Sequence, residues 1–464
     1  MSRLFISAAH KSSGKTTVTL GLCRALRNLG QRVQAFKKGP DYIDPIWHGL
    51  AAGRPSYNLD FHMMGLDEIG ALFARHARHA DISIIEGNKG LYGGMDLDGS
   101  NSNAALAKEL RAPVVLVLDT QGMTRGVAPL ILGYQAFDRD VEIAGVILNK
   151  VGGPRHEEKL RAVIERYTDV KVLGAVRTDH RLAIVERHLG LMPGNETEAA
   201  EERIEVIAAR VAEQVDLQAV LELAQAAKKA IGPPAPPVSA PPRAPGLRLA
   251  YAHDRAFGFY YQEDMDTLRD AGVDLLPVDT LKEVVLPDCD GLLIGGGFPE
   301  VFAGDLAGNA GLRGDIRRAV EAGLPVYAEC GGLMYLARSL SWDGPRHEMV
   351  GVVPGDVVMG SRPVGRGYAV LEETGDALWP IQARTIPAHE FHYSHLENLP
   401  SGLKYAYRVL RGHGMADGVD GFVYKHLLAS YCHRRGSGPQ GWIDPFLDQA
   451  RAYRSKKDAD RKAA

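Results

Sequence analysis

Residues 232–246, GPPAPPVSAPPRAPG, place seven prolines in fifteen positions. Proline lacks a backbone N–H and fixes φ, so this segment favours extended polyproline geometry and cannot build a packed core. A long surface loop within one domain is the alternative, but a new strand–helix pattern begins directly after the segment. We therefore predict an N-terminal domain at 1–231, a linker at 232–246 and a C-terminal domain at 247–450.

Short apolar runs alternate with helical patterns before the linker. Five runs are typical of strands buried on both faces: Leu4–Ala8, Arg32–Phe36, Ile82–Glu86, Pro113–Asp119 and Gly145–Asn149. Helical spacing covers Gly14–Leu29, and a longer helical pattern covers Glu196–Lys229. This alternation predicts an open parallel sheet covered by helices.

The pattern repeats in kind after the linker. Strand-like runs cover Leu247–Ala252, Gly291–Ile294 and Pro325–Ala328, and helical patterns cover Phe259–Ala271, Leu312–Ala322 and Leu333–Ser339. Later segments predict a more antiparallel portion: Met349–Val358, Gly367–Leu371, Tyr405–Leu410 and Gly421–Tyr424. We expect two α/β domains.

The composition narrows the class of protein. With 45% hydrophobic and 24% charged residues the chain is globular, and a net charge of −3 does not indicate a nucleic-acid partner. Four cysteines without a CxxC pair are no disulfide framework, which favours a reduced cytoplasmic protein. The sequence contains no run of about 18 apolar residues, so we predict no membrane span. Its N-terminal residues do not resemble a signal peptide.

The first predicted strand leads into AHKSSGKTT (9–17), which is typical of a phosphate-binding P-loop. In such a loop, backbone N–H groups and the helix N-terminus surround phosphate oxygens. Lys15 fits the lysine that reaches the outer phosphates, and Thr16 fits the hydroxyl that holds Mg²⁺, although Ala9 replaces the usual first glycine. A chance GKT in a turn is the alternative. Lys11 resembles the extra lysine of the dethiobiotin-synthetase and MinD-like group.

We predict that ATP is bound by Lys11, Ser13, Gly14, Lys15, Thr16, Thr17 and Asn149. Asn149 ends a strand, where it would contact the nucleotide base or simply form a turn. Asp41 and Asp44 follow the second strand, and Glu86 ends another. We predict a Mg²⁺ site at Thr16, Asp41 and Glu86, because Mg²⁺ prefers oxygen ligands. The alternative for the two aspartates is turn stabilisation.

Cys330 follows a buried strand and precedes two glycines and a helix, in AECGGLM. This pattern is typical of a nucleophile elbow, in which a sharp turn exposes the side chain. The helix N-terminus there favours a thiolate. A buried structural cysteine is the alternative.

A cysteine nucleophile needs a base, and His433 in ASYCH follows a late strand. The glycines of GGGFPE (295–300) can bring backbone N–H groups to a reacting carbonyl. We predict an oxyanion hole at Gly296 and Gly331, with an ordinary tight turn as the alternative.

Taken in order, these segments resemble the glutamine-dependent cobyrinic acid a,c-diamide synthase family over nearly the whole chain. The resemblance rests on nine motifs: SSGKTT (12–17), KGPDYIDP (38–45), EG (86–87), ERHLGL (186–191), AFGFYY (256–261), GGGFPE (295–300), AECGGLMYL (328–336), HEFHYS (389–394) and ASYCH (429–433). It implies a dethiobiotin-synthetase-like P-loop amidoligase domain followed by a class I type glutamine amidotransferase domain.

The resemblance also implies a reaction. Cys330, assisted by His433, releases ammonia from glutamine, and the ammonia crosses to the N-terminal site. There ATP and Mg²⁺ convert a substrate carboxylate to an acyl phosphate, which ammonia turns into an amide. The substrate would be a polycarboxylate tetrapyrrole amidated at its a and c acetates: cobyrinic or hydrogenobyrinic acid, or siroheme. Its contacts would be Tyr42, His48, Lys38 and Arg187.

Three departures from the family pattern stand out. Gly93 replaces an expected aspartate, for which Asp96 or Asp98 are the nearby substitutes. Arg435 stands where class I glutaminases keep the acid of the triad, so that acid is absent or elsewhere. Glu263-Asp264-Met265 replace a usual acid–Asn–Leu run. Apart from these departures, EGNKGLYGG (86–94) resembles a siroheme-amidating branch. The alternative function is a regulatory or partitioning ATPase with an inactive glutaminase-like domain. The sequence leaves a homodimer open.

Overall fold

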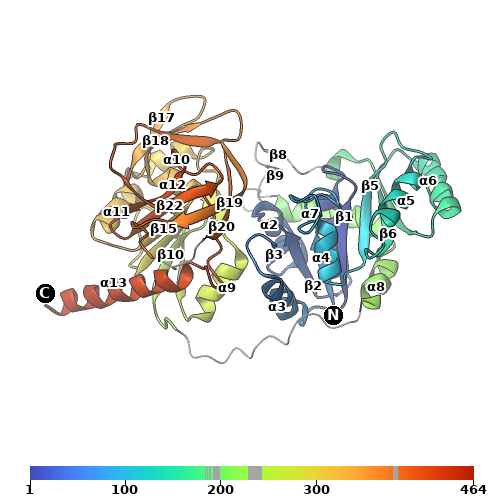
Figure 1. The fold of residues 1–464 in the computed structure, drawn as a ribbon, viewed down its shortest axis with the longest axis horizontal. Helices are drawn as coiled ribbons and strands as arrows, with labels where there is room; N and C mark the ends of the chain where they lie inside the picture. The colour runs from blue at the N-terminus through green and yellow to red at the C-terminus, as the bar shows by residue number, and fades with distance from the viewer. Residues whose placement is uncertain are drawn as a thin grey trace. The chain divides into compact units, whose positions relative to one another are not determined.

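The chain divides into two compact units, Met1–Pro237 and Val238–Ala464 (Figure 1). The computed structural model describes residues 1–182, 184, 186–187, 190–191, 199–227, 243–379 and 385–463. Most of the predicted linker (232–242) lies outside the described residues. The domain limits that we derived from the prolines therefore stay a prediction.

The N-terminal unit is built on a seven-stranded sheet in the order β3-β2-β4-β1-β5-β6-β7. Every neighbouring pair in it is parallel. The strands are β1 (Arg3–Ala8), β2 (Val33–Lys38), β3 (Tyr57–Leu59), β4 (Ile82–Glu86), β5 (Val114–Asp119), β6 (Ile143–Val151) and β7 (Lys171–Arg177). The sheet confirms the parallel architecture predicted from the continuous apolar runs.

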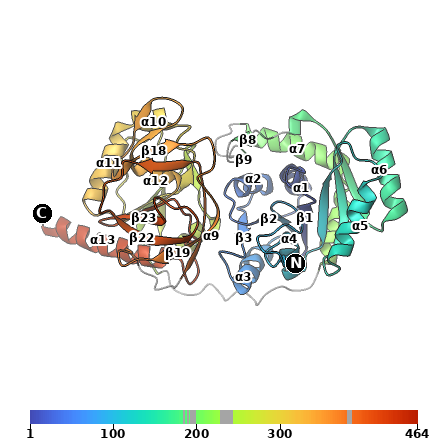
Figure 2. The ribbon, with the colours of Figure 1, turned by 45° about the horizontal axis from the view of Figure 1, so that its top comes forward.

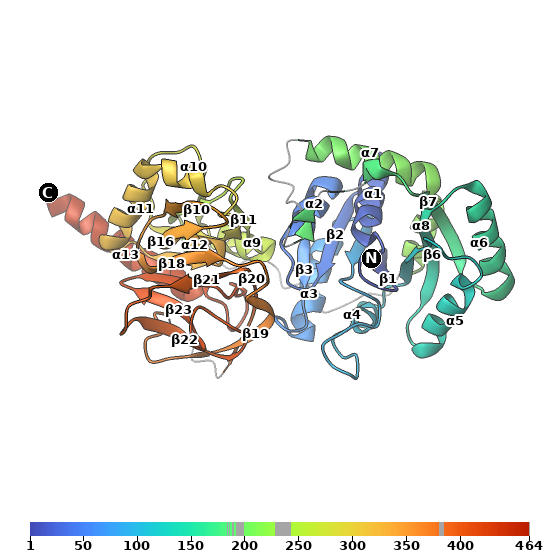
Figure 3. The ribbon, with the colours of Figure 1, turned by 90° about the horizontal axis from the view of Figure 1, so that it is seen from above.

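Helices cover both faces of this sheet (Figures 2 and 3). They are α1 (Lys15–Asn28), α2 (Ile43–Ala52), α3 (Leu66–Ala77), α4 (Asn103–Glu109), α5 (Val127–Phe137), α6 (Pro154–Tyr167), α7 (Ala200–Gln214) and α8 (Leu217–Ala226). Alternate strand residues such as Leu4 and Ile6 share one core with α1, α2, α7 and α8. On the other face Phe36 of β2 meets Phe73 of α3, with ring centroids 4.9 Å apart.

The strand order brings the candidate ligand-binding residues to one edge of the sheet. Because β1 lies between β4 and β5, the P-loop after Ala8 opens beside Glu86, and Ile6 is in register with Glu86. Lys37 of β2 is also in register with Glu86, from its other side. In open parallel sheets ligands bind at the carboxyl ends of the strands.

The C-terminal unit contains a mixed nine-stranded sheet in the order β12-β10-β13-β15-β24-β23-β22-β19-β20. Its parallel part comprises β10 (Arg248–Ala252), β12 (Asp274–Val278), β13 (Gly291–Ile294), β15 (Val326–Glu329) and β24 (Leu427–Ser430). Its antiparallel part comprises β23 (Val419–Tyr424), β22 (Lys404–Arg411), β19 (Gly365–Glu373) and β20 (Ile386–His392). Three of the four segments predicted for the antiparallel portion lie in this part, but Met349–Val358 overlaps β18 (Val353–Met359), which belongs to a separate four-stranded sheet and is parallel to one of its neighbours. The fold class of both units is α/β as predicted.

Smaller elements complete this unit. They are the helices α9 (Gln262–Asp270), α10 (Ala303–Gly308), α11 (Ala310–Glu321), α12 (Gly331–Leu336) and α13 (Ile443–Ala463), and the strands β11 (Phe257–Phe259), β14 (Gly296–Gly297), β16 (Ala337–Ser341), β17 (Arg346–Glu348), β18 (Val353–Met359) and β21 (Ser394–Glu397). No helix in the described parts of the chain is long and apolar enough to cross a membrane.

Three element predictions need correction. The helical pattern at 196–229 contains two helices, α7 and α8, because the Asp216 side chain accepts a hydrogen bond from Ala219 N and starts a new helix. The helix predicted from Phe259 begins only at Gln262, since 257–259 form β11. The helix predicted over 333–339 ends at Leu336, and Ala337 begins β16.

Packing between α1 and α7 holds the helix that follows the P-loop, and it depends on Gly21. A Cβ at this position would lie 2.3 Å from Val211 Cγ2. We expect Gly21→Val to destabilise the N-terminal unit by about 2 kcal/mol through overpacking. Chemical denaturation and hydrogen exchange of the α1 amides measure this effect. The matched control is Gly133→Ala on α5, where a Cβ meets no atom within 4 Å. This control should be neutral or stabilising, and equal losses in both variants would contradict the packing argument.

Candidate active sites at the strand ends of each unit

The loop between β1 and α1 has the backbone of a phosphate-binding turn. Ser12 and Gly14 have φ of 65° and 82°, and Lys15 is the first residue of α1. Asn149 Nδ2 donates to Ser13 O at 2.8 Å, so this amide supports the loop, and its predicted contact with the base stays a prediction. Ala9 is not among the residues with positive φ, which explains why a side chain is tolerated there.

The predicted ATP residues differ in exposure. Ser13 and Lys15 are buried, Gly14, Thr16 and Thr17 are half-buried, and Lys11 is exposed. Burial, followed by the charge of Lys37, lowers the pKa of Lys15, although Glu86 and Asp44 oppose this shift. A nearby anion stabilises the charged form of a lysine that is desolvated in this way, and the phosphates of a nucleotide would provide such an anion.

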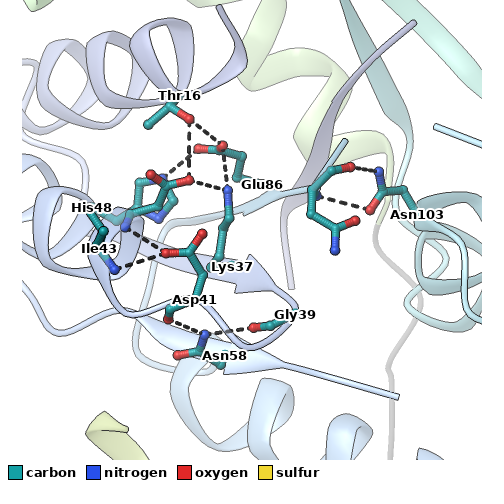
Figure 4. Close-up of polar contacts among 11 residues, drawn as sticks. Thr16, Lys37, Gly39, Asp41, Ile43, His48, Asn58, Glu86 and Asn103 are labelled. Carbon is teal, nitrogen blue, oxygen red and sulfur yellow. Dashed lines mark hydrogen bonds and ion pairs between the residues drawn. The ribbon is translucent and has the colours of Figure 1, made fainter. Parts of the chain in front are cut away.

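Thr16 lies in a cluster with Lys37, Asp44, Glu86 and His48 (Figure 4). Thr16 Oγ1 donates to Glu86 Oε1 at 2.8 Å and lies 3.4 Å from Asp44 Oδ2. The Lys37 ammonium contacts Asp44 and lies 2.8 Å from Glu86 Oε1. His48 Nε2 is 2.7 Å from Glu86 Oε2. Both oxygens of the Glu86 carboxylate, which is fully buried, are therefore occupied.

Opposite charge keeps this cluster ionised. Burial alone would raise the pKa of Glu86, but Lys37 and His48 outweigh it and hold that pKa far below its usual range. Burial likewise disfavours the charged form of Lys37, and Asp44 and Glu86 reverse this and raise its pKa. The two carboxylates and the ammonium thus depend on one another.

The cluster fits Mg²⁺ in part. Thr16, Asp44 and Glu86 offer oxygen donors beside the P-loop, and Mg²⁺ is typically held by one or two carboxylates together with substrate phosphates. Within the described ranges no group of three or more His, Cys, Asp or Glu side chains is arranged to hold a metal ion. Nucleotide phosphates would therefore have to complete the coordination shell.

Asp41 has a different role in the structure from that of Asp44. Its Oδ1 accepts hydrogen bonds from Ile43 N at 2.9 Å and Asp44 N at 3.0 Å, which is the turn-stabilising arrangement weighed as the alternative. Burial and the charge of Asp44 raise the pKa of Asp41 to about 6. Asp44 is the carboxylate that reaches Thr16, and Asp41 as a metal ligand stays a prediction.

The predicted substrate residues lie around the same edge. Tyr42 directly precedes α2 and is buried. Lys38 is buried with its ammonium 5.7 Å from the centroid of the Phe61 ring, and burial lowers its pKa to about 8. His48 is bound to Glu86, so contact with substrate would require it to leave that carboxylate. The side chain of Arg187 lies outside the described residues.

The loop after Glu86 is held by Asn103, which lies at the start of α4 (Figure 4). Its side chain accepts from Asn88 N at 3.2 Å and donates to Asn88 O and, at 2.8 Å, to Gly90 O. Asp96 accepts hydrogen bonds from Ser100 and Asn101, and Asp98 accepts from Ser100 N. Both candidate substitutes for the missing aspartate at Gly93 thus bond within the loop itself.

The second site begins at the junction of β15 and α12. Cys330 lies between them with φ of 48° and ψ of −103°, which are strained values for a residue with a side chain. Its N–H donates to Ser430 O of β24 at 2.7 Å. A Cβ on Gly332 would lie 2.1 Å from Ile294 O, so only glycine lets α12 approach β13 this closely. This geometry matches the predicted nucleophile elbow.

His433 is buried beside the elbow. Its Nδ1 lies 3.1 Å from Glu329 Oε2, and its ring stacks on His389 with centroids 4.8 Å apart. Burial lowers the pKa of His433, but hydrogen bonds with Cys330 and Glu329 outweigh this and raise it to about 10. The raised pKa favours the imidazolium form of His433 beside the elbow cysteine.

The two predicted oxyanion glycines flank this pair. A Cβ on Gly296 would lie 2.8 Å from His433 Cε1, so Gly296 packs against the imidazole. A Cβ on Gly331 would lie 3.0 Å from Gly297 N, so the elbow packs closely against the GGGFPE turn. Their role toward a reacting carbonyl stays a prediction.

Comparison with known proteins agrees with this geometry. Residues 5–191 match the CobQ/CobB/MinD/ParA nucleotide binding domain, and residues 248–437 match the CobB/CobQ-like glutamine amidotransferase domain. A protein of Magnetococcus marinus named cobyrinate a,c-diamide synthase is 46% identical over 98% of this chain and 97% of its own length. The chain belongs to the cobyrinate a,c-diamide synthase family. Proteins of that name from Listeria monocytogenes and Methanosarcina barkeri are 42% and 39% identical over 93% and 98% of this chain, and 96% and 97% of their own lengths.

Membership in the cobyrinate a,c-diamide synthase family confirms the resemblance found in the sequence. The sequence did not reveal Lys37 or Glu329 as site residues, although each adjoins a residue that was singled out. Lys37 precedes Lys38 on a buried strand, and a lysine in such a strand needs a carboxylate partner. That signal was available, but the identity of the partners was not.

The Lys37 cluster predicts a strong effect of removing one charge. In Lys37→Met, buried Glu86 and Asp44 lose their common counter-ion, and we expect a loss of about 3 kcal/mol in the free energy of unfolding. The control is Lys108→Met, which breaks a 2.7 Å pair with Asp138 at a lysine that is 40% exposed. That change should cost less than about 1 kcal/mol. Denaturation of both variants without nucleotide decides the matter, and equal losses would refute the mutual dependence of the charges.

Proposed function

We propose that this chain is a glutamine- and ATP-dependent ligase that converts the a and c acetate carboxylates of a tetrapyrrole into carboxamides. One observation carries the proposal: the same chain contains two sites. The first is an elbow cysteine that is hydrogen-bonded to a buried histidine, and the second is a P-loop beside a cluster of carboxylates. The relatives named cobyrinate a,c-diamide synthase align with both halves, which supports the same division of labour.

In the glutaminase half, the Cys330 thiolate attacks the side-chain amide carbon of glutamine. Backbone N–H groups near Gly296 and Gly331 would stabilise the resulting oxyanion. His433 then donates its proton to the departing nitrogen, and ammonia leaves behind a thioester on Cys330. Water hydrolyses the thioester, with His433 as the base, and glutamate is released.

In the ligase half, a substrate carboxylate oxygen attacks the γ-phosphorus of ATP, and ADP leaves. Ammonia attacks the acyl carbon of the resulting acyl phosphate, and inorganic phosphate leaves. Lys15 and the N-terminus of α1 would hold the phosphates, and Thr16, Asp44 and Glu86 are the oxygen donors suited to Mg²⁺. When bound, Mg²⁺ would neutralise charge that develops on the phosphates.

Ammonia must reach the acyl phosphate unprotonated, because ammonium has no lone pair to attack carbon. We therefore propose that it passes between the two reactions without release to water. For the substrate, Lys38 supplies a buried cation whose lowered pKa favours pairing with a carboxylate. The candidates remain cobyrinic or hydrogenobyrinic acid and siroheme, each a polycarboxylate.

Cys330→Ser separates the two half-reactions. We expect glutamine-dependent amidation to fall more than about 1,000-fold, because the hydroxyl is a far weaker nucleophile than the thiolate. Amidation with added ammonium at high pH should persist, since it needs only the ligase half. Assays of glutamate release and of carboxamide formation, with Lys15→Ala as a control that abolishes both amidations, measure the split.

The regulatory ATPase alternative makes the opposite forecast. It requires ATP hydrolysis with no glutamate released from glutamine by the unmodified chain. That result would refute the proposed function.

Mass spectrometry identifies the tetrapyrrole. The chain is incubated with ATP, Mg²⁺, glutamine and either cobyrinic acid or siroheme, and we expect conversion of two carboxylates to carboxamides in one of them. Conversion of neither, with glutaminase activity intact, would contradict a tetrapyrrole substrate of these two classes.

A further inference from the structure

The Cys330–His433 pair lacks an acid at the position two residues after the histidine. Arg435 occupies that position, and its guanidinium binds Glu263 at the start of α9, with nitrogen–oxygen distances of 2.7 and 2.9 Å. This side chain is therefore engaged with α9. A cationic group also cannot accept the Nδ1 proton of an imidazole.

An acid on a different strand contacts His433. Glu329, the last residue of β15, directly precedes Cys330, and its Oε2 lies 3.1 Å from His433 Nδ1. In a regular strand two successive side chains point to opposite faces. The positive φ of Cys330 interrupts that alternation, so neighbouring residues can both contact one imidazole.

The other oxygen of Glu329 is fixed by two donors. Tyr327 Oη donates to Oε1 at 2.5 Å, and Arg434 N donates to it at 2.9 Å. Tyr327 is two residues earlier on the same face of β15 and stacks on Trp442, with centroids 4.0 Å apart. These contacts hold the carboxylate in one orientation, with Oε2 directed at the histidine.

We propose that Glu329 is the positioning acid of a Cys330–His433–Glu329 triad, in which nucleophile and acid are consecutive residues. The inference rests on the glutaminase half of the proposed function. By accepting the Nδ1 proton, Glu329 fixes the tautomer and leaves Nε2 for the thiol, and its charge stabilises the imidazolium. The charged and titratable groups around His433 include Cys330 and Glu329 from the elbow, His389 from β20, which is hydrogen-bonded to Tyr261, and the adjacent Arg434.

The test is Glu329→Gln in the full chain, assayed by glutamate release. We expect kcat to fall roughly 100-fold with KM for glutamine changed less than about 3-fold, because the tautomer and the imidazolium lose support. The basic limb of the kcat/KM profile should move to lower pH by about one unit, since removing the carboxylate lowers the pKa of His433. Glu329→Asp should recover part of the rate.

Two further variants keep the result interpretable. Tyr327→Phe removes one bond to Glu329 but leaves its charge, so a smaller fall in kcat is expected. Glu263→Gln removes the other nearby acid, which binds Arg435, and should leave the pH profile in place. A profile moved by Glu263→Gln and unmoved by Glu329→Gln, or a Glu329→Gln variant with unchanged kcat and profile, overturns the assignment.

Alkylation of Cys330 by iodoacetamide, followed across pH, gives a readout independent of turnover. Glu329→Gln should move the onset of fast alkylation to higher pH, because the imidazolium that favours the thiolate loses its acid, and an unchanged onset would contradict the triad. An unmodified chain that alkylates in this pattern but releases no glutamate would refute the proposed function and leave the triad standing.

Discussion

Parallel strands that end beside one another are the constraint on which both halves of this protein depend. In the N-terminal unit, β1, β2 and β4 bring the P-loop, Lys37 and Glu86 to one edge, although 70 residues separate Thr16 from Glu86. In the C-terminal unit, β15 and β24 are parallel neighbours, so Cys330 and His433 leave the sheet side by side. Each site combines residues that are distant in sequence because parallel pairing aligns the ends of strands.

Buried charge is the second theme, and the two sites use it differently. In the ligase unit, Lys37 neutralises two carboxylates that would otherwise be costly to bury beside the P-loop. In the glutaminase unit, Glu329 and Cys330 surround His433 and favour its charged form despite burial. The first arrangement preserves oxygen donors in the ionised state, and the second sustains the reactivity of a thiol.

Two of the non-glycine residues with positive φ, Ser12 and Cys330, lie where chemistry is expected. Cys330 adopts a positive φ that a side chain disfavours, and the chain supports it through the Cys330 N to Ser430 O bond and through the glycines that follow. Ser12 has a similar φ in the P-loop, and Lys150 donates to its carbonyl at 3.0 Å. Neighbouring contacts over-determine both turns, as strained functional turns require.

The sequence alone determined the α/β class, the P-loop, the elbow cysteine and the family, because local patterns encode strands, tight turns and their glycines. The tertiary structure decided which charges meet. Asp44 rather than Asp41 reaches Thr16, since the Oδ1 of Asp41 accepts hydrogen bonds within the turn into α2. Glu329 meets His433 because β15 and β24 are neighbours and a positive φ turns the chain between Glu329 and Cys330. Spacing along a chain cannot reveal such contacts, because strand order and side-chain direction are properties of the folded sheet.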